Sequence, residues 1–176
     1  MSGHNKWSKI KHKKAASDAQ KSKVFSKHAQ LIAYESKKAS GDINAPGLRA
    51  AIEKAKKDNM PSDNITRAIK KGAGSDAGSM EIVTYEAYGP GGVALVIEGI
   101  TDNKNRTGAE VKHALSEAGL ELAAPGSALW AFAKEGAEWK ANATVPVSPE
   151  DGEKLSSLID AIEDLDDIQA VFTNAE

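Results

Sequence analysis

Residues 83–100, VTYEAYGPGGVALVIEGI, mark the point where the chain changes from a helical to a strand periodicity. Val83, Tyr85 and Ala87 alternate with Thr84, Glu86 and Tyr88, which is the period of two expected of a half-buried strand. The glycine-rich stretch 89–92 predicts a turn, and the apolar run after it predicts a buried returning strand over residues 93–100. The second half of the chain is therefore expected to contain a sheet.

Before this hairpin, apolar residues recur at steps of three and four, which predicts helices. We expect them over residues 15–39, 46–58 and 62–71. The third is expected to start with Ser62 as its N-cap and to end before Gly72 as the residue just past its last turn. The first part of the chain is therefore predicted to be a small helical bundle.

After the hairpin the two periods alternate. The pattern predicts a helix over residues 105–118 and strands over residues 129–133, 143–147 and 168–173. Ser148 with an aspartate three residues later forms a capping box, which predicts a further helix. The expected fold class is α+β, a small N-terminal helical bundle followed by an α+β domain with helices packed on one sheet.

The net charge of −2 conceals a strong polarity along the chain. Residues 1–74 hold 17 lysines and arginines against six acids, a net charge of +11, and residues 75–176 hold six against 19, a net charge of −13. Such asymmetry indicates two modules, one of which faces a polyanion. With residues 75–79 as a flexible linker, we expect a basic nucleic-acid-binding domain over residues 1–74 and an acidic domain over residues 80–176.

Several classes of protein are disfavoured by the composition. There is no cysteine, so disulfides and thiolate metal sites are excluded. The longest apolar run, residues 93–97, is too short to cross a bilayer, and no secretory signal pattern is present, so we expect a cytoplasmic protein with no membrane partner. His4, His12 and His28 lack metal-ligand spacing, and no nucleophile stands with a base and an orienting group. We therefore expect no enzyme activity, no metal and no cofactor.

Five stretches in order along the chain resemble signatures of the YebC family. They are GHNKWSKIKHKK (3–14), NMP with RAIKKG (59–61 and 67–72), YGPGG (88–92), TDNKNRT (101–107) and IEDLDDIQAV (162–171). The resemblance implies a cytoplasmic regulator of gene expression that binds nucleic acid. Bacterial members are described as DNA-binding transcriptional regulators, the mitochondrial relative as a translational activator of a cytochrome oxidase subunit, and other descriptions place members on the ribosome, where they relieve stalling at proline-rich stretches.

The chain departs from the family pattern in one place. Family members usually carry a third domain between the strands predicted here at residues 129–133 and 143–147. Only a short link, about residues 134–142, stands there in this sequence. We therefore expect the third domain to be absent, and functions that depend on it do not carry over.

The lysine-rich N-terminal tail is the strongest candidate site. Lysines on a flexible backbone adjust to irregular phosphate spacing, and neutralised phosphates release condensed counterions. Trp7 has two interpretations, stacking on an unpaired base or docking on the bundle. The candidate residues of the tail are Lys6, Trp7, Lys9, Lys11, His12, Lys13 and Lys14.

Helix-borne cations extend this candidate surface, although a run of charge is often only a solvated face. Those predicted to bind nucleic acid are Lys21, Lys23, Lys27, Arg67, Lys70 and Lys71, with Arg49, Lys54, Lys56 and Lys57 as further members. Residues 46–58 and 62–71 would form a helix-turn-helix that favours DNA, yet the outward residues of the second helix, Asn64, Arg67 and Lys71, offer little for base-edge readout.

The stretch 101–107 leads from a strand into a helix and has two interpretations. Asp102, Asn103 or Asn105 would cap that helix. Alternatively, free backbone N–H groups together with Lys104 and Arg106 would hold a phosphate.

The favoured hypothesis is a non-enzymatic translation factor that binds ribosomal RNA on the ribosome. The alternative is a DNA-binding transcriptional regulator that uses helices 46–58 and 62–71. A protein partner held by the acidic domain is compatible with either, and the sequence predicts no oligomeric state.

Overall fold

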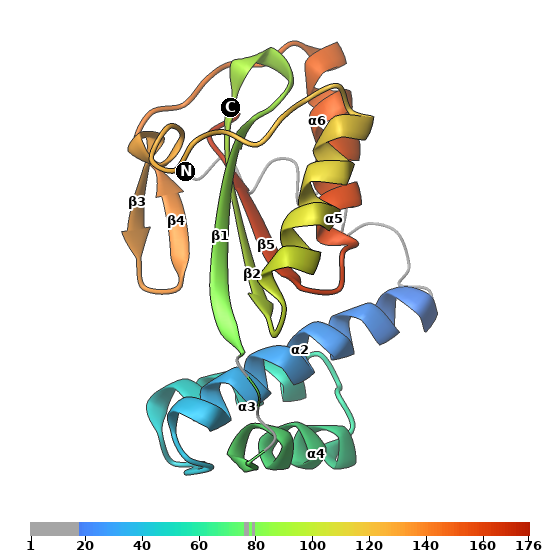
Figure 1. Ribbon diagram of the computed structural model, residues 1–176, viewed down its shortest axis with the longest axis vertical. Helices are drawn as coiled ribbons and strands as arrows, with labels where there is room; N and C mark the ends of the chain where they lie inside the picture. The colour runs from blue at the N-terminus through green and yellow to red at the C-terminus, as the bar shows by residue number, and fades with distance from the viewer. Residues whose placement is uncertain (1–17, 76–77, 79) are drawn as a thin grey trace. The chain divides into compact units, whose positions relative to one another are not determined.

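The computed structural model describes residues 18–75, 78 and 80–176, and divides into two compact units (Figure 1). The unit that we call the helical unit comprises the described residues from 18 to 82 together with residues 100–104. The unit that we call the sheet unit comprises residues 83–99 and 105–176. Within the described residues, no helix is both long enough and apolar enough to cross a membrane.

The helical unit is built from α2 (Asp18–Lys38), α3 (Pro46–Lys57) and α4 (Ser62–Ala73). Helix α2 packs against both of the others, while α3 and α4 touch each other much less. Their apolar stripes meet in a core that includes Ile32, Leu48, Ala55, Met60 and Ile65, all buried. The predicted helical bundle is confirmed, because the apolar residues of all three helices meet in this core; Val24 of α2 lies outside it and is exposed.

The ends of α4 differ from the prediction. Pro61 is the N-cap, and Ser62 lies inside the helix with no side-chain cap. Gly72 is a buried helical residue rather than the residue past the end, since a Cβ there would lie 2.1 Å from the carbonyl oxygen of Ala33. The glycine is therefore required by the close approach of α4 to α2. It is not required by a left-handed conformation at the end of the helix, which was the predicted reason.

The sheet unit contains a three-stranded sheet in the order β1 (Glu81–Tyr88), β2 (Ala94–Thr101) and β5 (Ile168–Thr173). Strands β2 and β5 are antiparallel. Helices α5 (Lys104–Glu117) and α6 (Pro149–Glu163) pack on one face of this sheet. The core between them includes Leu95, Ile97, Val111, Leu115, Leu155, Ile162 and Val171, which confirms the predicted α+β class.

Two of the predicted local features of this unit are confirmed. The hydroxyl of Ser148 accepts a hydrogen bond from the backbone N–H of Asp151 at 3.1 Å and opens α6, as the capping box predicts. The turn over residues 89–92 contains a short 3₁₀ segment in which Gly91 and Gly92 have φ of 77° and 76°. Glycine adopts such left-handed angles without steric cost, so the turn is tight.

The strands between α5 and α6 are shifted from their predicted places. Residues Leu129–Ala131 form a 3₁₀ turn, and β3 (Phe132–Glu135) starts only after it. Its partner β4 (Glu138–Ala141) lies in the stretch predicted to be a link, whereas residues 143–147 form no strand and contribute one isolated bridge, from Val145 to Ala175.

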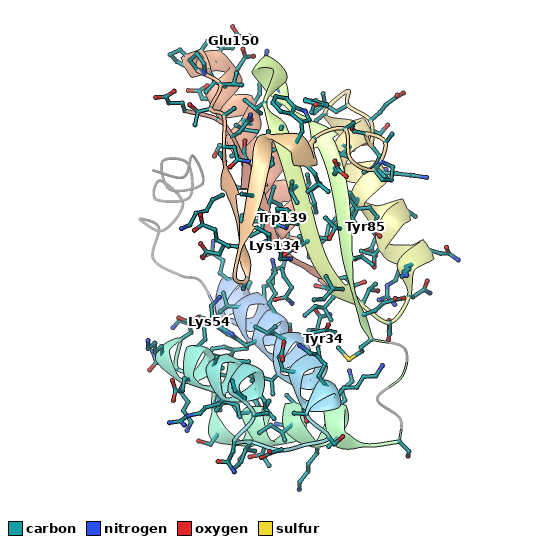
Figure 2. The ribbon with its side chains drawn as sticks, turned by 90° about the vertical axis from the view of Figure 1, so that its left-hand side faces the viewer. Tyr34, Lys54, Tyr85, Lys134, Trp139 and Glu150 are labelled. Atoms are coloured by element: carbon teal, nitrogen blue, oxygen red, sulfur yellow. The ribbon has the colours of Figure 1, made fainter. Side chains whose placement is uncertain are left out.

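The β3–β4 hairpin covers the face of the sheet that the helices leave open. Ala94, Val96 and Phe172 on this face pack with Phe132, and Trp139 of β4 lies against the same cluster. The carboxylate of Glu98 on β2 accepts hydrogen bonds from Lys134 Nζ at 2.8 Å and Trp139 Nε1 at 2.9 Å. Lys134 Nζ also lies 4.9 Å from the centre of the Trp139 ring, a cation–π contact (Figure 2). The hairpin is thus attached to the sheet through β2.

Candidate nucleic-acid interface

The tail residues predicted to bind nucleic acid lie outside the described residues. They are Lys6, Trp7, Lys9, Lys11, His12, Lys13 and Lys14. Within the sequence they directly precede α2, whose first described residue is Asp18. The part of the predicted surface that the structure does describe is therefore the helical unit.

One contact brings the middle of α2 beside the end of α3. The ring Nε2 of His28 lies 2.6 Å from the Oδ2 atom of Asp58, the residue that follows α3. His28 is only 7% exposed, and its ring is held against the bundle. Residues of α2 near His28 and residues in the last turn of α3 consequently share one end of the helical unit.

Lysines from both helices are exposed at this end. Lys21 lies seven residues before His28, on the same helical stripe but about 10 Å further along the axis toward the start of α2. Lys54, Lys56 and Lys57 are exposed in the last turn of α3, and Figure 2 labels Lys54. We call these four residues the α2–α3 lysine surface. Among the described residues, none of the four has an ion-pair partner.

Lys23 and Lys27, also predicted, lie four residues apart on α2 and are half-buried. They make contacts within the molecule, so they contribute charge at this end without being freely solvated. At 100° per residue, they lie about 160° and 120° around the helix axis from Lys21, on another side of α2.

The two predicted lysines of α4 lie beside a different part of α2 from the lysines of α3. Lys70 and Lys71 are exposed in its last turn, and this end of α4 contacts α2 where Ser36 Oγ donates to the Ile69 carbonyl at 2.7 Å. Residues 28 and 36 of α2 are about 12 Å apart along the helix axis. Lysines in a last turn also interact favourably with the helix dipole, which holds for these two and equally for Lys54, Lys56 and Lys57 of α3.

Helix α4 offers few side chains that could contact base edges. Arg67 donates from Nη2 to Asn64 Oδ1 at 2.7 Å, so two of the three outward polar residues bind each other. A guanidinium held in this way is less available for a bidentate contact with a guanine edge.

The cations of the 101–107 stretch both have carboxylate partners. Lys104 Nζ lies 2.9 Å from Glu81, and Arg106 Nη2 lies 2.7 Å from Asp167. Asp167 is buried, and it also accepts a hydrogen bond from Thr107 Oγ1 at 2.7 Å. A phosphate at this helix start would compete with both ion pairs.

Thr101 takes part at this helix start in a way that the sequence reasoning missed. Its Oγ1 accepts a hydrogen bond from the backbone N–H of Asn103 at 2.9 Å. The threonine hydroxyl thus satisfies a backbone donor immediately before α5, a role that the prediction gave to Asp102, Asn103 or Asn105.

The sheet unit neutralises most of its own positive charges. It has five lysines and arginines against 16 acids, and four of the five are paired with carboxylates: Arg106 with Asp167, Lys134 with Glu98, Lys140 with Glu135 and Lys154 with Glu150. By contrast, the described residues of the helical unit hold 13 lysines and arginines against eight acids. Capacity for binding a polyanion is therefore concentrated in the helical unit.

Two of these exposed pairs shift the pKa values of their members. The hydrogen bond and the positive charge of Lys154 lower the pKa of Glu150, and the hydrogen bond and charge of Glu150 raise that of Lys154. The pKa of Lys140 is raised in the same way by Glu135. Where the structure describes the chain, no group of three or more histidine, aspartate or glutamate side chains is placed to hold a metal ion.

Comparisons with known proteins match almost the whole chain. The sequence model of the TACO1/YebC protein N-terminal domain matches residues 5–75, and that of the TACO1/YebC second and third domain matches residues 80–138 and 134–175. A probable transcriptional regulatory protein of Fervidobacterium nodosum is 38% identical over 235 residues, which cover 99% of this chain and 93% of the relative. Another of Geobacter sulfurreducens is 51% identical over 138 residues, 77% of this chain and 56% of the relative.

A solved structure is also similar. The crystal structure of a conserved hypothetical protein from Aquifex aeolicus superimposes with a TM-score of 0.85 at 33% identity and covers 95% of each chain. The two proteins therefore share the same fold over almost the whole of both chains.

The alignments also locate a difference in length. The alignment with the Fervidobacterium relative spans 235 positions and this chain has 176 residues, so about 60 positions of the relative have no counterpart here. The match to the second and third domain breaks into two pieces that meet at residues 134–138, the turn of the β3–β4 hairpin. The family model is therefore interrupted at this hairpin.

Proposed function

This chain belongs to the TACO1/YebC family, and we propose that it is a regulator of gene expression that binds nucleic acid through its basic end. The observation that carries the proposal is the α2–α3 lysine surface, which leaves four ammonium groups without a carboxylate among the described residues. The lysine-rich tail precedes α2 in the sequence and adds five further lysines.

The preferred target is RNA on the ribosome, where the protein acts as a translation factor. A lysine ammonium is a point charge that contacts phosphates without reading bases. The one arginine on the outer side of α4, Arg67, is bound to Asn64. A surface of this kind suits the irregular phosphate backbone of folded RNA better than a defined DNA sequence.

The alternative function is DNA-binding regulation of transcription. Its support is that relatives are named probable transcriptional regulatory proteins. On this alternative α4 would enter the major groove, and Lys71 with a released Arg67 would contact bases.

Sedimentation of a cell lysate through a sucrose gradient tests the preferred target. We expect the tagged full chain in ribosomal fractions at low salt and its release at high salt, because counterion release weakens phosphate contacts. Absence from ribosomal fractions at low salt would rule out the translation proposal. Gel shifts of the purified protein with many duplexes test the alternative, which requires a preference above bulk competitor DNA.

A triple variant tests which surface makes the contacts. Replacing Lys21, Lys54 and Lys57 by Gln removes three charges from the α2–α3 lysine surface. We expect the slope of log K against log[salt] for RNA to become shallower by about 2, since each single-strand phosphate contributes roughly 0.7. The control Lys112→Gln removes an exposed lysine from α5 and is expected to leave the slope unchanged. Equal slopes for the triple variant and the control would refute the assignment.

A further inference from the structure

The sheet unit exposes two aromatic side chains that are held in place. Trp130 is 64% exposed and Tyr88 is 37% exposed. The indole Nε1 of Trp130 donates to the Tyr88 hydroxyl at 3.1 Å, and that hydroxyl in turn donates to the Ser127 carbonyl. The Trp130 ring is therefore fixed at its polar edge while much of its surface is in solvent.

The loop that presents Trp130 is clamped from inside the unit. The carboxylate of Glu86, which is only 5% exposed, accepts three backbone hydrogen bonds, from Gly126 at 2.6 Å, Ala128 at 2.8 Å and Leu129 at 2.9 Å. Hydrogen bonds to an ionised acceptor are stronger than those between neutral groups. The aromatic pair is thus preorganised, so these side chains would lose little conformational entropy when a partner binds.

The surroundings of the aromatic pair are negative. Ala87 bridges Leu122 in antiparallel register, which places Glu121 directly opposite Tyr88 and on the same face. Glu121 is exposed, and within the part of the chain that the structure describes it has no ion-pair partner. Most cations of this unit are already paired with acids, so no excess positive charge offsets Glu121.

We propose that Trp130, Tyr88 and Glu121 bind a lysine- or arginine-rich segment of a protein partner. The faces of indole and phenol rings attract cations, and a guanidinium stacks on them well. Glu121 adds a carboxylate within reach of the same cation, while the net negative charge of the sheet unit attracts basic proteins and repels nucleic acid. Tryptophan and tyrosine are also the residues that most often anchor protein interfaces.

This inference does not depend on the nucleic-acid proposal, because it concerns a different unit and a partner of opposite charge. Binding is measured by ¹⁹F NMR with the full chain labelled with 5-fluorotryptophan. The chain has three tryptophans, which are expected to give separate ¹⁹F resonances. The Trp130 resonance is assigned as the one lost in Trp130→Phe. The probe is a short peptide that alternates arginine and glycine.

We expect the peptide to shift the Trp130 resonance, and Trp130→Ala to weaken binding about fivefold. Trp130→Phe keeps an aromatic face, so its affinity for the peptide is expected to lie between that of the unmodified chain and that of Trp130→Ala. Glu121→Gln is expected to weaken binding about twofold, whereas Glu153→Gln, which removes an exposed acid from α6, is not.

Two results would overturn the proposal. The first is an unchanged peptide affinity in Trp130→Ala or a loss of the same size in Glu153→Gln, either of which would mean that the peptide senses only overall charge. The second is a Trp130 resonance that moves with oligouridylate and not with the peptide, which would make the aromatic pair a base-stacking site. Circular dichroism of each variant checks that the fold is kept, and Trp130 is exposed enough that Trp130→Phe is expected to preserve it.

Discussion

Arg106 donates from Nη2 to Oδ2 of Asp167 across 2.7 Å and so connects the first turn of α5 to the start of β5. The same carboxylate oxygen accepts from Thr107 Oγ1, and Asp167 is 4% exposed. A buried carboxylate is stable only when its hydrogen bonds are made. Arg106 therefore has a structural role that the sequence alone did not indicate.

Arg106→Gln is expected to lower the free energy of unfolding by about 1–2 kcal/mol, since it removes a charged partner from a buried acid while the arginine side chain itself is half-exposed. Urea denaturation followed by circular dichroism measures this change. Lys112→Gln, on the same helix but exposed, serves as the control and is expected to change stability by less than about 0.5 kcal/mol.

The same variant separates the two interpretations of the 101–107 stretch. If Arg106 holds a phosphate, Arg106→Gln weakens RNA binding at unchanged stability. Loss of stability with RNA affinity kept would instead support the ion pair with Asp167 as its main role.

Two glycines in helices are expected to respond in opposite directions to alanine. In Gly72→Ala the new methyl group would lie 2.1 Å from the Ala33 carbonyl oxygen, so α2 and α4 must move apart, at a cost of about 2–3 kcal/mol. In Gly108→Ala the nearest atom is the Tyr85 hydroxyl at 3.6 Å, an ordinary contact.

Gly108→Ala is therefore expected to stabilise the protein by about 0.5–1 kcal/mol, because glycine is a poorer helix former than alanine. Thermal unfolding of both variants beside the unmodified chain measures the difference. Equal effects of the two substitutions would contradict the close α2–α4 packing.

Local patterns predicted most of the fold. The alternation over residues 83–88 and the capping box at Ser148 depend on neighbours in sequence, and both are found in the structure. The β3–β4 hairpin was misplaced because each strand has only four residues, too few to show a period. What fixes it is long-range: Trp139 reaches Glu98, 41 positions earlier.

The candidate site was predicted by composition and not by geometry. Counting lysines located the basic half of the chain, but charge counts do not reveal which cations already have partners. Lys104 and Glu81 are far apart in sequence, and so are Arg106 and Asp167. Gly72 was misread for the same reason, since the residue that requires it, Ala33, lies on another helix.

The tail is expected to contribute to binding without contributing to folding. Replacing Lys9, Lys11, Lys13 and Lys14 by Gln is expected to make the salt slope shallower by about 3 for single-stranded RNA, because phosphate contacts add. The unfolding midpoint in urea is expected to stay unchanged. Filter binding over a series of salt concentrations measures the slope, and an unaltered slope would remove the tail from the interface.

Glu86→Gln is expected to release the loop that carries Trp130. The substitution keeps the size of the side chain, but an amide nitrogen must replace one oxygen and face backbone N–H donors. Because at least one of the three N–H groups then loses its acceptor and the charge is gone, we expect a loss of about 2–3 kcal/mol in the free energy of unfolding.

The loss should also be local. Amide hydrogen exchange of Gly126, Ala128 and Leu129 is expected to accelerate in Glu86→Gln well before that of the β2 core, since opening of this loop no longer breaks charged hydrogen bonds. Glu98→Gln is the matched control, a partly buried acid on the neighbouring strand whose partners are side chains of the β3–β4 hairpin. If exchange at the three amides rises equally in both variants, the clamp assigned to Glu86 is wrong, and the fixed orientation of Trp130 needs another cause.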